Sequence, residues 1–353
     1  MKRNQLKGFF TGILTCALVF ALFGSAAAVL EKKSMEGYSG VQVIYNGKTL
    51  EMTDVNGKPV QAFVSDGTTY VPIRAVSEAM GAKVSWDQAD QTAVINNYES
   101  LFQACRVYAE DEDTVYGYRI YVPEDYSKDR SYPVVVALHG GGSRGTDNVS
   151  QLDQIQAQVW VDKQLTGEIE DVIVVAPQQH PKYGFFMDSA CVTTVLDDVE
   201  ANYNVDKNRI YLTGTSMGGM GSWSTAAANP DRFAAILASA GVYPDARYTF
   251  PVGIIAPAFD GDVKKTVTPE AEWKSAMEAY AQALKDMPIR MFHSKADAMA
   301  PVEYTEYMET CMKNVGATNC TFTYFEGVAH GQTYQTIVEQ YPDSITWLLA
   351  QHK

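Results

Sequence analysis

A serine lies between two glycines in the pentapeptide Gly214-Thr215-Ser216-Met217-Gly218. The run 209–213, whose central residues are apolar, precedes it and reads as a buried strand, and residues 219–228 read as a helix. This pattern predicts a tight turn that presents the Ser216 hydroxyl at the tip of a strand, where it can act as a nucleophile. A purely structural turn is the alternative interpretation, because small residues cluster in many turns.

An acid and a histidine follow this serine along the chain. The order serine, acid, histidine is one in which the three residues of a serine catalytic triad occur. Asp297 comes after the strand-like residues 288–293, and His330 comes after the strand-like residues 321–325. The histidine can take the proton of the serine hydroxyl as a general base, and the carboxylate can orient that histidine. Asp262 is the competing acid, but it lies in a segment with few strand-forming residues.

A glycine-rich turn supplies the third part of this chemistry. The residues Leu138-His139-Gly140-Gly141-Gly142 end the apolar run 132–137, which reads as a strand. Backbone N–H groups in such a turn can stabilise an oxyanion, since the donors must be in place before the charge develops. We expect the oxyanion hole to combine the N–H of Met217 with an N–H near Gly141. His139 is therefore expected to be a structural loop residue rather than a base.

Candidate substrate-binding residues follow the strand-like residues 172–176. They are Gln178, His180, Tyr183 and Phe186. Ligands of α/β sheets bind at such strand ends, and the aromatic rings here can pack against an aryl group. At least one phenylalanine of this stretch is nevertheless expected in the core. His293 ends another strand and is expected to be buried and hydrogen-bonded.

The order of elements after residue 99 predicts the sheet that must hold these loops. Apolar runs that read as strands alternate with helical patterns, as at residues 192–199. The strand-like segments are residues 105–108, 118–122, 134–138, 172–176, 210–212, 235–238, 289–292 and 322–325. This alternation predicts an α/β fold, with a mostly parallel sheet, helices on both faces and a hairpin formed by the first two strands.

One long connection interrupts this rhythm. Residues 242–287 separate two consecutive strands, and residues 271–284 within them show an amphipathic helical pattern with Thr268 as a candidate N-cap. Two interpretations stay open. Either the segment is a sheet-covering helix with a long lead-in, or residues 243–263 form part of a cap over the site, since long loops in compact domains are often functional.

Residues 1–28 are predicted to be a secretory signal peptide. Residues 1–7 are basic, residues 8–22 are mostly apolar, and Ser25-Ala26-Ala27-Ala28 offers a cleavage site. A retained membrane anchor is the alternative, but the apolar run is short for a full span. We therefore expect cleavage near Ala28 and a secreted protein, free or associated with the cell surface, without a membrane partner after cleavage.

Composition limits the partners and cofactors. The formal net charge of −14 disfavours binding to nucleic acid or to an anionic membrane. Export permits disulfides without requiring them, and the cysteines after the leader are Cys105, Cys191, Cys311 and Cys320. Whether Cys311 and Cys320 form a bridge stays open. The chain has no C-x-x-C motif or His/Cys cluster, so the sequence predicts no metal and no cofactor.

Residues 29–98 are predicted to form a separate accessory module. Asn46-Gly47 predicts a hairpin turn, residues 73–80 a short helix, and residues 83–86 with 92–95 a second hairpin. Three segments resemble the copper amine oxidase N-terminal-like domain of secreted Gram-positive proteins: YNGKT at 45–49, TYVPIRAV at 69–76 and MGAKVSWD at 80–87. The resemblance implies an accessory role for a small α+β unit. Because the module has no histidine, no copper is expected there.

Residues 99–353 are predicted to be the catalytic domain. Its distinctive segments are YVPEDY at 121–126, LHGGGSRGTDN at 138–148, VAPQ at 175–178, YNVDKNRIYLTGTSMGG at 203–219, NPDRFAA at 229–235 and GVAH at 327–330. They resemble the secreted α/β-hydrolase esterases known as predicted peptidases, relatives of feruloyl esterases and polyhydroxybutyrate depolymerases. The resemblance implies an α/β-hydrolase fold, carboxylic ester hydrolysis, and a triad of Ser216, Asp297 and His330. The long segment 242–287, and Ser294 where relatives usually have glycine, depart from the family and bear on substrate choice.

The expected function is that of a secreted serine carboxylesterase that works through an acyl-enzyme. Aryl or feruloyl, acetyl and polyester substrates all fit, so plant cell-wall polysaccharide and polyester are both candidate partners. A serine peptidase is one alternative, and a surface-binding protein whose module is the functional part is another. The acyl and alcohol specificity, the module's ligand and the oligomeric state are not fixed by the sequence.

Overall fold

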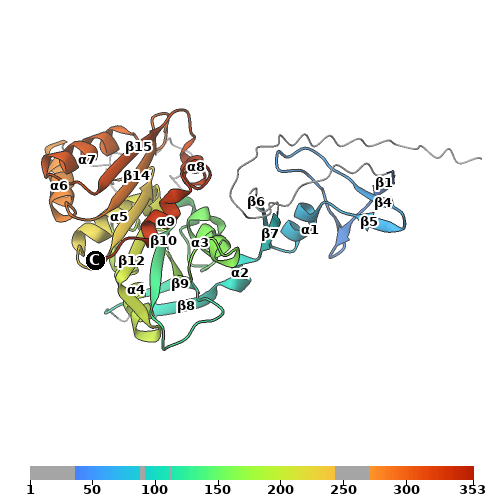
Figure 1. The fold of residues 1–353 in the computed structure, drawn as a ribbon, viewed down its shortest axis with the longest axis horizontal. Coiled ribbons are helices and arrows are strands. Elements are labelled where there is room, and N and C mark those ends of the chain that lie inside the picture. Colours follow the sequence, from blue (N-terminus) through green and yellow to red (C-terminus); the bar gives the residue numbers. More distant parts are fainter. Residues whose placement is uncertain (1–35, 88–91, 112, 243–269) are drawn as a thin grey trace, which may run out of the picture. The chain divides into compact units, whose positions relative to one another are not determined.

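The computed structural model describes residues 36–353 except 88–91, 112 and 243–269 (Figure 1). The chain divides into two compact units, Met1–Leu101 and Phe102–Lys353, close to the border that the sequence places at residue 98. The predicted leader and Asp262 lie outside the described residues.

The first unit consists of short antiparallel strands and short helices in its described part. Its elements are β1 (Tyr38–Val41), β2 (Ile44–Tyr45), β3 (Lys48–Thr49), β4 (Ala62–Ser65), β5 (Thr68–Tyr70), α1 (Ile73–Ala79), β6 (Lys83–Asp87), β7 (Thr92–Asn96) and α2 (Tyr98–Leu101). Strands β1, β4 and β5 form one sheet, whereas β2–β3 and β6–β7 are separate hairpins. Both predicted hairpins and the predicted helix are confirmed.

The second unit contains one mixed sheet with the strand order β15-β14-β13-β12-β10-β11-β9-β8. The strands are β8 (Gln103–Tyr108), β9 (Val115–Tyr121), β10 (Tyr132–Leu138), β11 (Ile173–Gln178), β12 (Val205–Thr215), β13 (Ala235–Ser239), β14 (Ile289–Ser294) and β15 (Cys320–Phe325). The strands from β15 to β11 run parallel, and β9 and β8 add an antiparallel edge. The predicted mostly parallel sheet with an initial hairpin is therefore confirmed.

Helices cover both faces of this sheet (Figure 1). They are η1 (Gly141–Ser143), η2 (Ser150–Asp153), α3 (Ile155–Leu165), α4 (Ala190–Asn202), α5 (Met217–Ala228), α6 (Glu270–Ala283), α7 (Glu303–Asn314), η3 (His330–Gln332), α8 (Thr333–Gln340) and α9 (Asp343–Leu349). Buried residues of α4 to α7 join Val134 and Val136 in one apolar cluster. The intervening Val135 faces the other side of the sheet, where α3, α8 and α9 pack.

This two-sided cover explains why the strands read as unbroken apolar runs. All residues of β10 are buried, because helices on both faces of a parallel sheet hide both sides of each strand. Helix α6 packs against α5 and α7, and its buried Met277 joins the core. The predicted helix at 271–284 thus contributes to the cover, and the predicted cap at 243–263 lies outside the described residues.

The cysteines of the described part are free thiols, so Cys311 and Cys320 are not bridged. Burial raises the pKa of the Cys191 thiol and of the Cys311 thiol. Both therefore behave as small apolar side chains of the core rather than as reactive groups. Among the described residues, no helix has both the length and the apolar character that crossing a membrane requires.

Candidate active site

Ser216 occupies a sharp turn between β12 and α5, as the sequence predicts. Its backbone adopts φ 58° and ψ −120°, a conformation that side-chain-bearing residues rarely take. The Ser216 N–H donates to the carbonyl of Ser239 at 2.9 Å, and its carbonyl accepts the N–H of Met220 at 2.9 Å. These bonds hold the strained residue between β13 and the first turn of α5. The strand–turn–helix context of a nucleophile elbow is therefore present.

The glycines around Ser216 are required by close packing. A Cβ at Gly214 would lie 2.5 Å from the backbone of Gly218, and a Cβ at Gly218 would overlap the carbonyl oxygen of Leu138. A Cβ at Gly219 would lie 2.6 Å from the carbonyl oxygen of Ser239. Helix α5 can thus approach the ends of β10, β12 and β13 only because these positions lack side chains.

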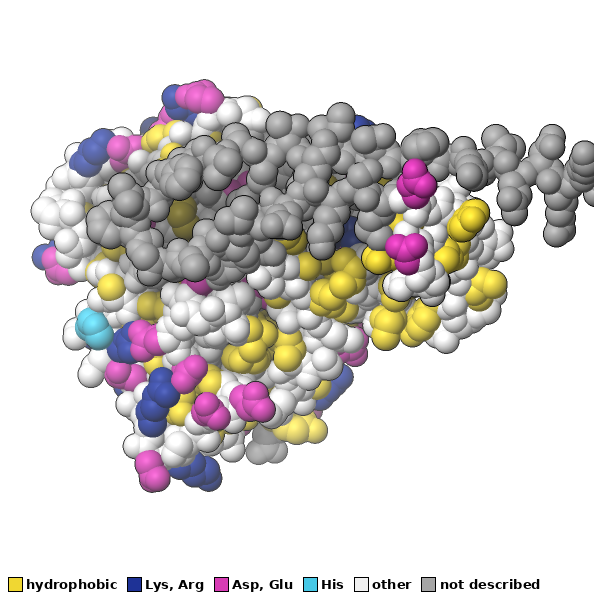
Figure 2. Space-filling view, turned by 45° about the vertical axis from the view of Figure 1, so that its right-hand side comes forward, with side chains coloured by type: hydrophobic (Ala, Val, Ile, Leu, Met, Phe, Trp, Pro, Cys, Tyr) yellow, Lys and Arg dark blue, Asp and Glu magenta, His cyan; other side chains and the backbone are white. Residues whose placement is uncertain are grey.

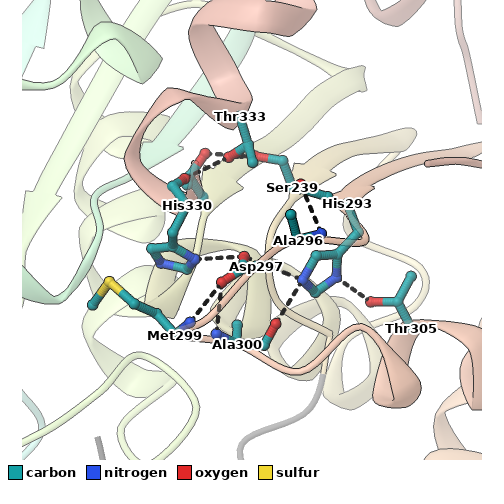
Figure 3. A network of polar contacts seen from close by, with 11 residues as sticks. Ser239, His293, Ala296, Asp297, Met299, Ala300, Thr305, His330 and Thr333 are labelled. Carbon is teal, nitrogen blue, oxygen red and sulfur yellow. Dashed lines mark hydrogen bonds and ion pairs between the residues drawn. The ribbon is translucent and has the colours of Figure 1, made fainter. Parts of the chain in front are cut away.

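Asp297 and His330 form a hydrogen-bonded pair. Asp297 lies in the loop after β14, and His330 opens η3 after β15. The Nδ1 atom of His330 lies 2.7 Å from Oδ2 of Asp297 (Figure 3). Since a carboxylate accepts hydrogen bonds, Nδ1 carries the proton and Nε2 of a neutral ring is the acceptor. That is the tautomer that a general base acting through Nε2 needs.

The Asp297 carboxylate is fully buried, yet it is held in the ionised form. Burial by itself would raise its pKa, but hydrogen bonds from His293 and His330 and from the Ala300 N–H hold the pKa well below its usual range. Its Oδ1 accepts the N–H groups of Met299 and Ala300, both at 2.8 Å. The His330 side chain is 12% exposed. A charged acid behind a partly accessible histidine is the arrangement expected of an acid–base pair.

A chain of hydroxyl groups connects the serine turn with the histidine turn. Thr215 Oγ1 lies 2.7 Å from Ser239 Oγ, which in turn lies 3.4 Å from Thr333 Oγ1. Thr333 donates to the carbonyl of His330 at 3.0 Å. Because β12, β13, β14 and β15 are parallel neighbours, their following loops meet at one edge of the sheet. Ser216, Asp297 and His330 all follow strands at this edge.

Gly141 and Met217 are each the first residue of a helix. Gly141 opens η1 after β10, and Met217 opens α5 after the neighbouring strand β12. The N–H groups at the start of a helix have no partner within the helix and favour negative charge. A Cβ built at Gly141 would face open space, so a substrate atom can approach this backbone. Both residues are therefore suitably placed as oxyanion donors, and this role stays a prediction.

His139 is a buried structural residue, as expected. Its Nε2 accepts the N–H of Gln179 at 3.0 Å, and its Nδ1 lies 2.7 Å from the carbonyl of Gly140. The ring is therefore a neutral tautomer that donates from Nδ1. Burial lowers the pKa of His139 to about 4. This histidine joins the glycine-rich turn to the end of β11 and is not available as a base.

Gln178 does not fit the prediction that it contacts substrate. Its side chain is buried, and its Oε1 accepts the N–H of Asn148 at 2.6 Å. Its Nε2 donates to Asp147 Oδ1 at 2.7 Å and to the Ser143 carbonyl at 3.3 Å. The amide is thus fully used in fastening the loop after β10. The sequence located it at a strand end but could not tell which way it points.

The remaining candidates of this stretch differ in exposure. Tyr183 is 44% exposed, and its ring lies 5.9 Å from that of the exposed His180. Phe186 is half-buried and packs against the core, and its ring lies against the backbone of Gly184. Phe185 is fully buried, so the expectation of one core phenylalanine is confirmed. Contact of His180, Tyr183 or Phe186 with substrate stays a prediction.

Sequence reasoning missed Arg144, which connects two loops of the site. Its Nε donates to the carbonyl of Gly141 at 3.0 Å, and its Nη1 donates to the carbonyl of Pro181 at 3.0 Å. The glycine-rich turn is therefore tied to the loop that carries His180 and Tyr183. Nothing in the sequence indicates that this arginine turns inward. In the described part of the chain, no three His, Cys, Asp or Glu side chains converge as a metal site.

Comparison with known proteins gives two family matches. The "Putative esterase" model matches residues 112–296, and the "Copper amine oxidase N-terminal domain" model matches residues 44–104. Acetylxylan esterase A of Emericella nidulans is 27% identical over 225 residues, which cover 58% of this chain and 68% of the relative. Liver carboxylesterase B-1 of Rattus norvegicus is 28% identical over 172 residues, 45% of this chain but 27% of that protein.

Solved structures support the same fold. A thermostable esterase superposes with a TM-score of 0.57 at 28% identity, covering 72% of this chain and 64% of that chain. A ferulic acid esterase has a TM-score of 0.54 at 18% identity, covering 70% of this chain and 98% of that chain, which supports the fold alone. The second unit has the α/β-hydrolase fold, and the chain spans about two thirds of the thermostable esterase.

Proposed function

The chain belongs to the "Putative esterase" family of carboxylic ester hydrolases, and we propose on this premise that Ser216, His330 and Asp297 are its catalytic triad. The hydrogen bond of 2.7 Å between His330 and Asp297 carries the proposal. It leaves Nε2 of the histidine as the acceptor for the serine proton. The serine lies in a strained turn at the same edge of the sheet.

The proposed mechanism has two halves. Ser216 Oγ attacks the ester carbonyl while His330 Nε2 takes its proton, and the alcohol leaves with that proton. Water then attacks the acyl-enzyme, again with His330 as the base, and the acid is released. Asp297 stays ionised and stabilises the imidazolium in both halves, in keeping with its lowered pKa. The N–H groups of Gly141 and Met217 stabilise the oxyanion.

The proposed substrates are esters of acetyl or aryl acids, such as feruloyl groups, on plant cell-wall polysaccharide or on other polymers. The similarity to an acetylxylan esterase supports acetyl esters. The exposed ring of Tyr183, on a loop that Arg144 ties to the oxyanion turn, supports aryl esters because aromatic rings stack on such surfaces. We further propose that the predicted leader sends the protein out of the cell, where such polymers occur.

The first unit is proposed to be an accessory module. Strand β5 is exposed at all its positions, and Tyr38 and Val55 are 66% and 77% exposed. Apolar side chains are visible at the surface of the described residues in Figure 2. A module of this kind, tethered to an enzyme, raises the effective concentration of the enzyme on a polymer that it binds.

The test uses purified protein and a panel of esters: p-nitrophenyl acetate, p-nitrophenyl butyrate, methyl ferulate, acetylated xylan and an aliphatic polyester film. We expect hydrolysis of at least one small ester, and a loss of about a thousandfold or more in Ser216→Ala with unchanged circular dichroism. Substantial turnover by the folded variant would contradict the triad. Cleavage of peptide substrates without ester hydrolysis would instead favour a peptidase.

A further inference from the structure

Asp297 contacts a second histidine that the proposed mechanism does not use. Nε2 of His293 lies 3.3 Å from Oδ2 of Asp297, the same oxygen that His330 contacts at 2.7 Å. Figure 3 shows the two imidazole rings on opposite sides of this carboxylate. The His293 side chain is 1% exposed, so it cannot reach a substrate. Any effect of His293 on catalysis must therefore pass through Asp297.

The neighbours of His293 fix its tautomer. Nε2 lies 2.9 Å from the carbonyl oxygen of Ala300 as well as near the Asp297 carboxylate. Both groups can only accept, so Nε2 carries a hydrogen and shares it between them in a three-centre bond. Nδ1 lies 2.7 Å from Oγ1 of Thr305, a buried residue of α7. The Thr305 hydroxyl can donate to a neutral ring at this position, and α7 thereby keeps the Nε2–H directed at the acid.

The orientation of Asp297 does not depend on His293 alone. Its other oxygen, Oδ1, is held by the backbone N–H groups of Met299 and Ala300. Removing the His293 N–H would therefore leave the carboxylate in place but with one donor fewer on Oδ2. The negative charge on that oxygen would then act more strongly on His330.

We propose that His293 is a positioning residue whose Nε2–H weakens the pull of the Asp297 carboxylate on the His330 proton. His330 then releases its proton at a lower pH than it would beside a carboxylate that no second histidine contacts. The proposal rests on the proposed triad. It extends that triad to a chain of Thr305, His293, Asp297 and His330, in which the buried histidine competes for the oxygen that stabilises the imidazolium.

Other charged groups on the packed elements are too exposed to replace this effect. Lys295 after β14 pairs with Glu326 after β15 at 2.7 Å, and both are exposed. Glu303 and Glu306 on α7 are exposed as well. Tyr324, the partner of His293 on β15, donates its hydroxyl to Glu309. The exposed charges among these act on the pair through solvent, where charges are screened. The partly buried Glu309 is neutralised by Lys313 at 2.6 Å.

The experiment compares the full-length protein with His293→Leu, His293→Gln and Thr305→Val. The titration of His330 is followed by NMR of ring-labelled histidine, with the His330 signal assigned by His330→Ala. We expect His293→Leu to move the midpoint of the His330 titration to higher pH by about one unit. His293→Gln places an amide N–H near the position of Nε2 and should keep the wild-type midpoint. Thr305→Val should give a smaller shift in the same direction.

A midpoint that is unchanged or lower in His293→Leu would overturn the proposal, since a purely structural role changes stability without raising the midpoint. If His293→Leu does not fold, Thr305→Val decides the same question. The acid limb of kcat/KM for a small ester should follow the NMR midpoint. Absence of ester hydrolysis by the wild-type protein would contradict the proposed function while leaving the NMR comparison readable, so the two failures are distinguishable.

Discussion

The two units use backbone strain differently. Among the described residues of the first unit, the non-glycine residues with positive φ are Asn46 at 49° and Asp66 at 47°, residue types that tolerate this conformation in hairpin turns. In the second unit, Asn148 at 56° is again a tolerant residue type, but Ser216 at 58° and Ala240 at 51° adopt the conformation although their side chains do not favour it. A Cβ at Gly241 would lie only 2.6 Å from the carbonyl oxygen of Ser216, so the backbone around the strained serine is closely packed.

This difference shows where the fold keeps a residue in a backbone conformation that its residue type disfavours. The strained serine lies between strands buried on both faces, whereas the strands of the first unit are short and largely exposed. A turn that follows its residues' own preferences needs no surrounding structure, but an unfavourable turn persists only where packing determines it. All five histidines of the chain also lie in the second unit. We therefore expect the chemistry to reside in the second unit.

The largest effect is expected from Asp297→Asn. The variant should reduce kcat for a small ester by about 10³- to 10⁴-fold, because the histidine then takes the wrong tautomer. Asp262→Asn is the matched control and should be mild. The measurement is kcat at saturating ester for both folded variants. A damaging Asp262→Asn beside a mild Asp297→Asn would show that Asp262, and not Asp297, is the acid.

Gly218→Ala should destabilise the second unit. The added methyl group overlaps the Leu138 carbonyl, so α5 must move away from β10 at a cost of about 1–3 kcal/mol. Gly142→Ala is the control, because its methyl group would face open space and should change the free energy of unfolding by less than about 0.5 kcal/mol. Urea unfolding measures both. Equal stability of the two variants would show that the elbow is not closely packed.

His139 should make stability depend on pH. Its pKa of about 4 in the folded state lies below the value of about 6.5 expected when unfolded, so the unfolded chain binds the proton more readily. The free energy of unfolding is therefore at its full value above about pH 6.5. It falls as the pH is lowered toward 4, by up to about 3 kcal/mol. His139→Gln should flatten this slope in urea unfolding between pH 7 and pH 4.5. An unchanged slope would mean that other groups cause the pH dependence and that folding does not lower the pKa of His139.

The smallest effect is expected from removing the first unit. A chain of residues 98–353 should hydrolyse p-nitrophenyl acetate at a rate near that of the full-length protein, because the proposed site residues all lie within it. Any loss should appear on insoluble substrates such as acetylated xylan. A soluble, folded but inactive fragment would contradict the division of roles, and an insoluble fragment would indicate that the first unit covers apolar surface of the second.

Much of the fold and site could be predicted because the determinants are local. Gly214 and Gly218 flank the serine at fixed spacing, and apolar runs mark the strands. The pairing of Asp297 with His330 followed from their order after strands. The first two signals are readable in a linear sequence because each depends on residues a few positions apart, and the third needs only the order of the strands along the chain.

The rest depends on side-chain direction in the folded molecule. The place of Gln178 at a strand end predicts contact with substrate, but its amide turns into the loop at Asn148. The sequence predicts that His293 is buried, but its contact with Asp297 needs the loop after β14 to fold back over the strand end. Its second partner, Thr305, comes from α7. No spacing rule predicts such contacts between a strand end, a loop and a helix.

The most direct test of the triad is mass-spectrometric mapping of a fluorophosphonate adduct, since this probe reacts with activated serines. We predict one adduct per chain on the peptide that contains Ser216, and none in His330→Ala, because the serine is a weak nucleophile without its base. Labelling of another residue, or ester hydrolysis by a protein whose Ser216 stays unlabelled, would contradict the account.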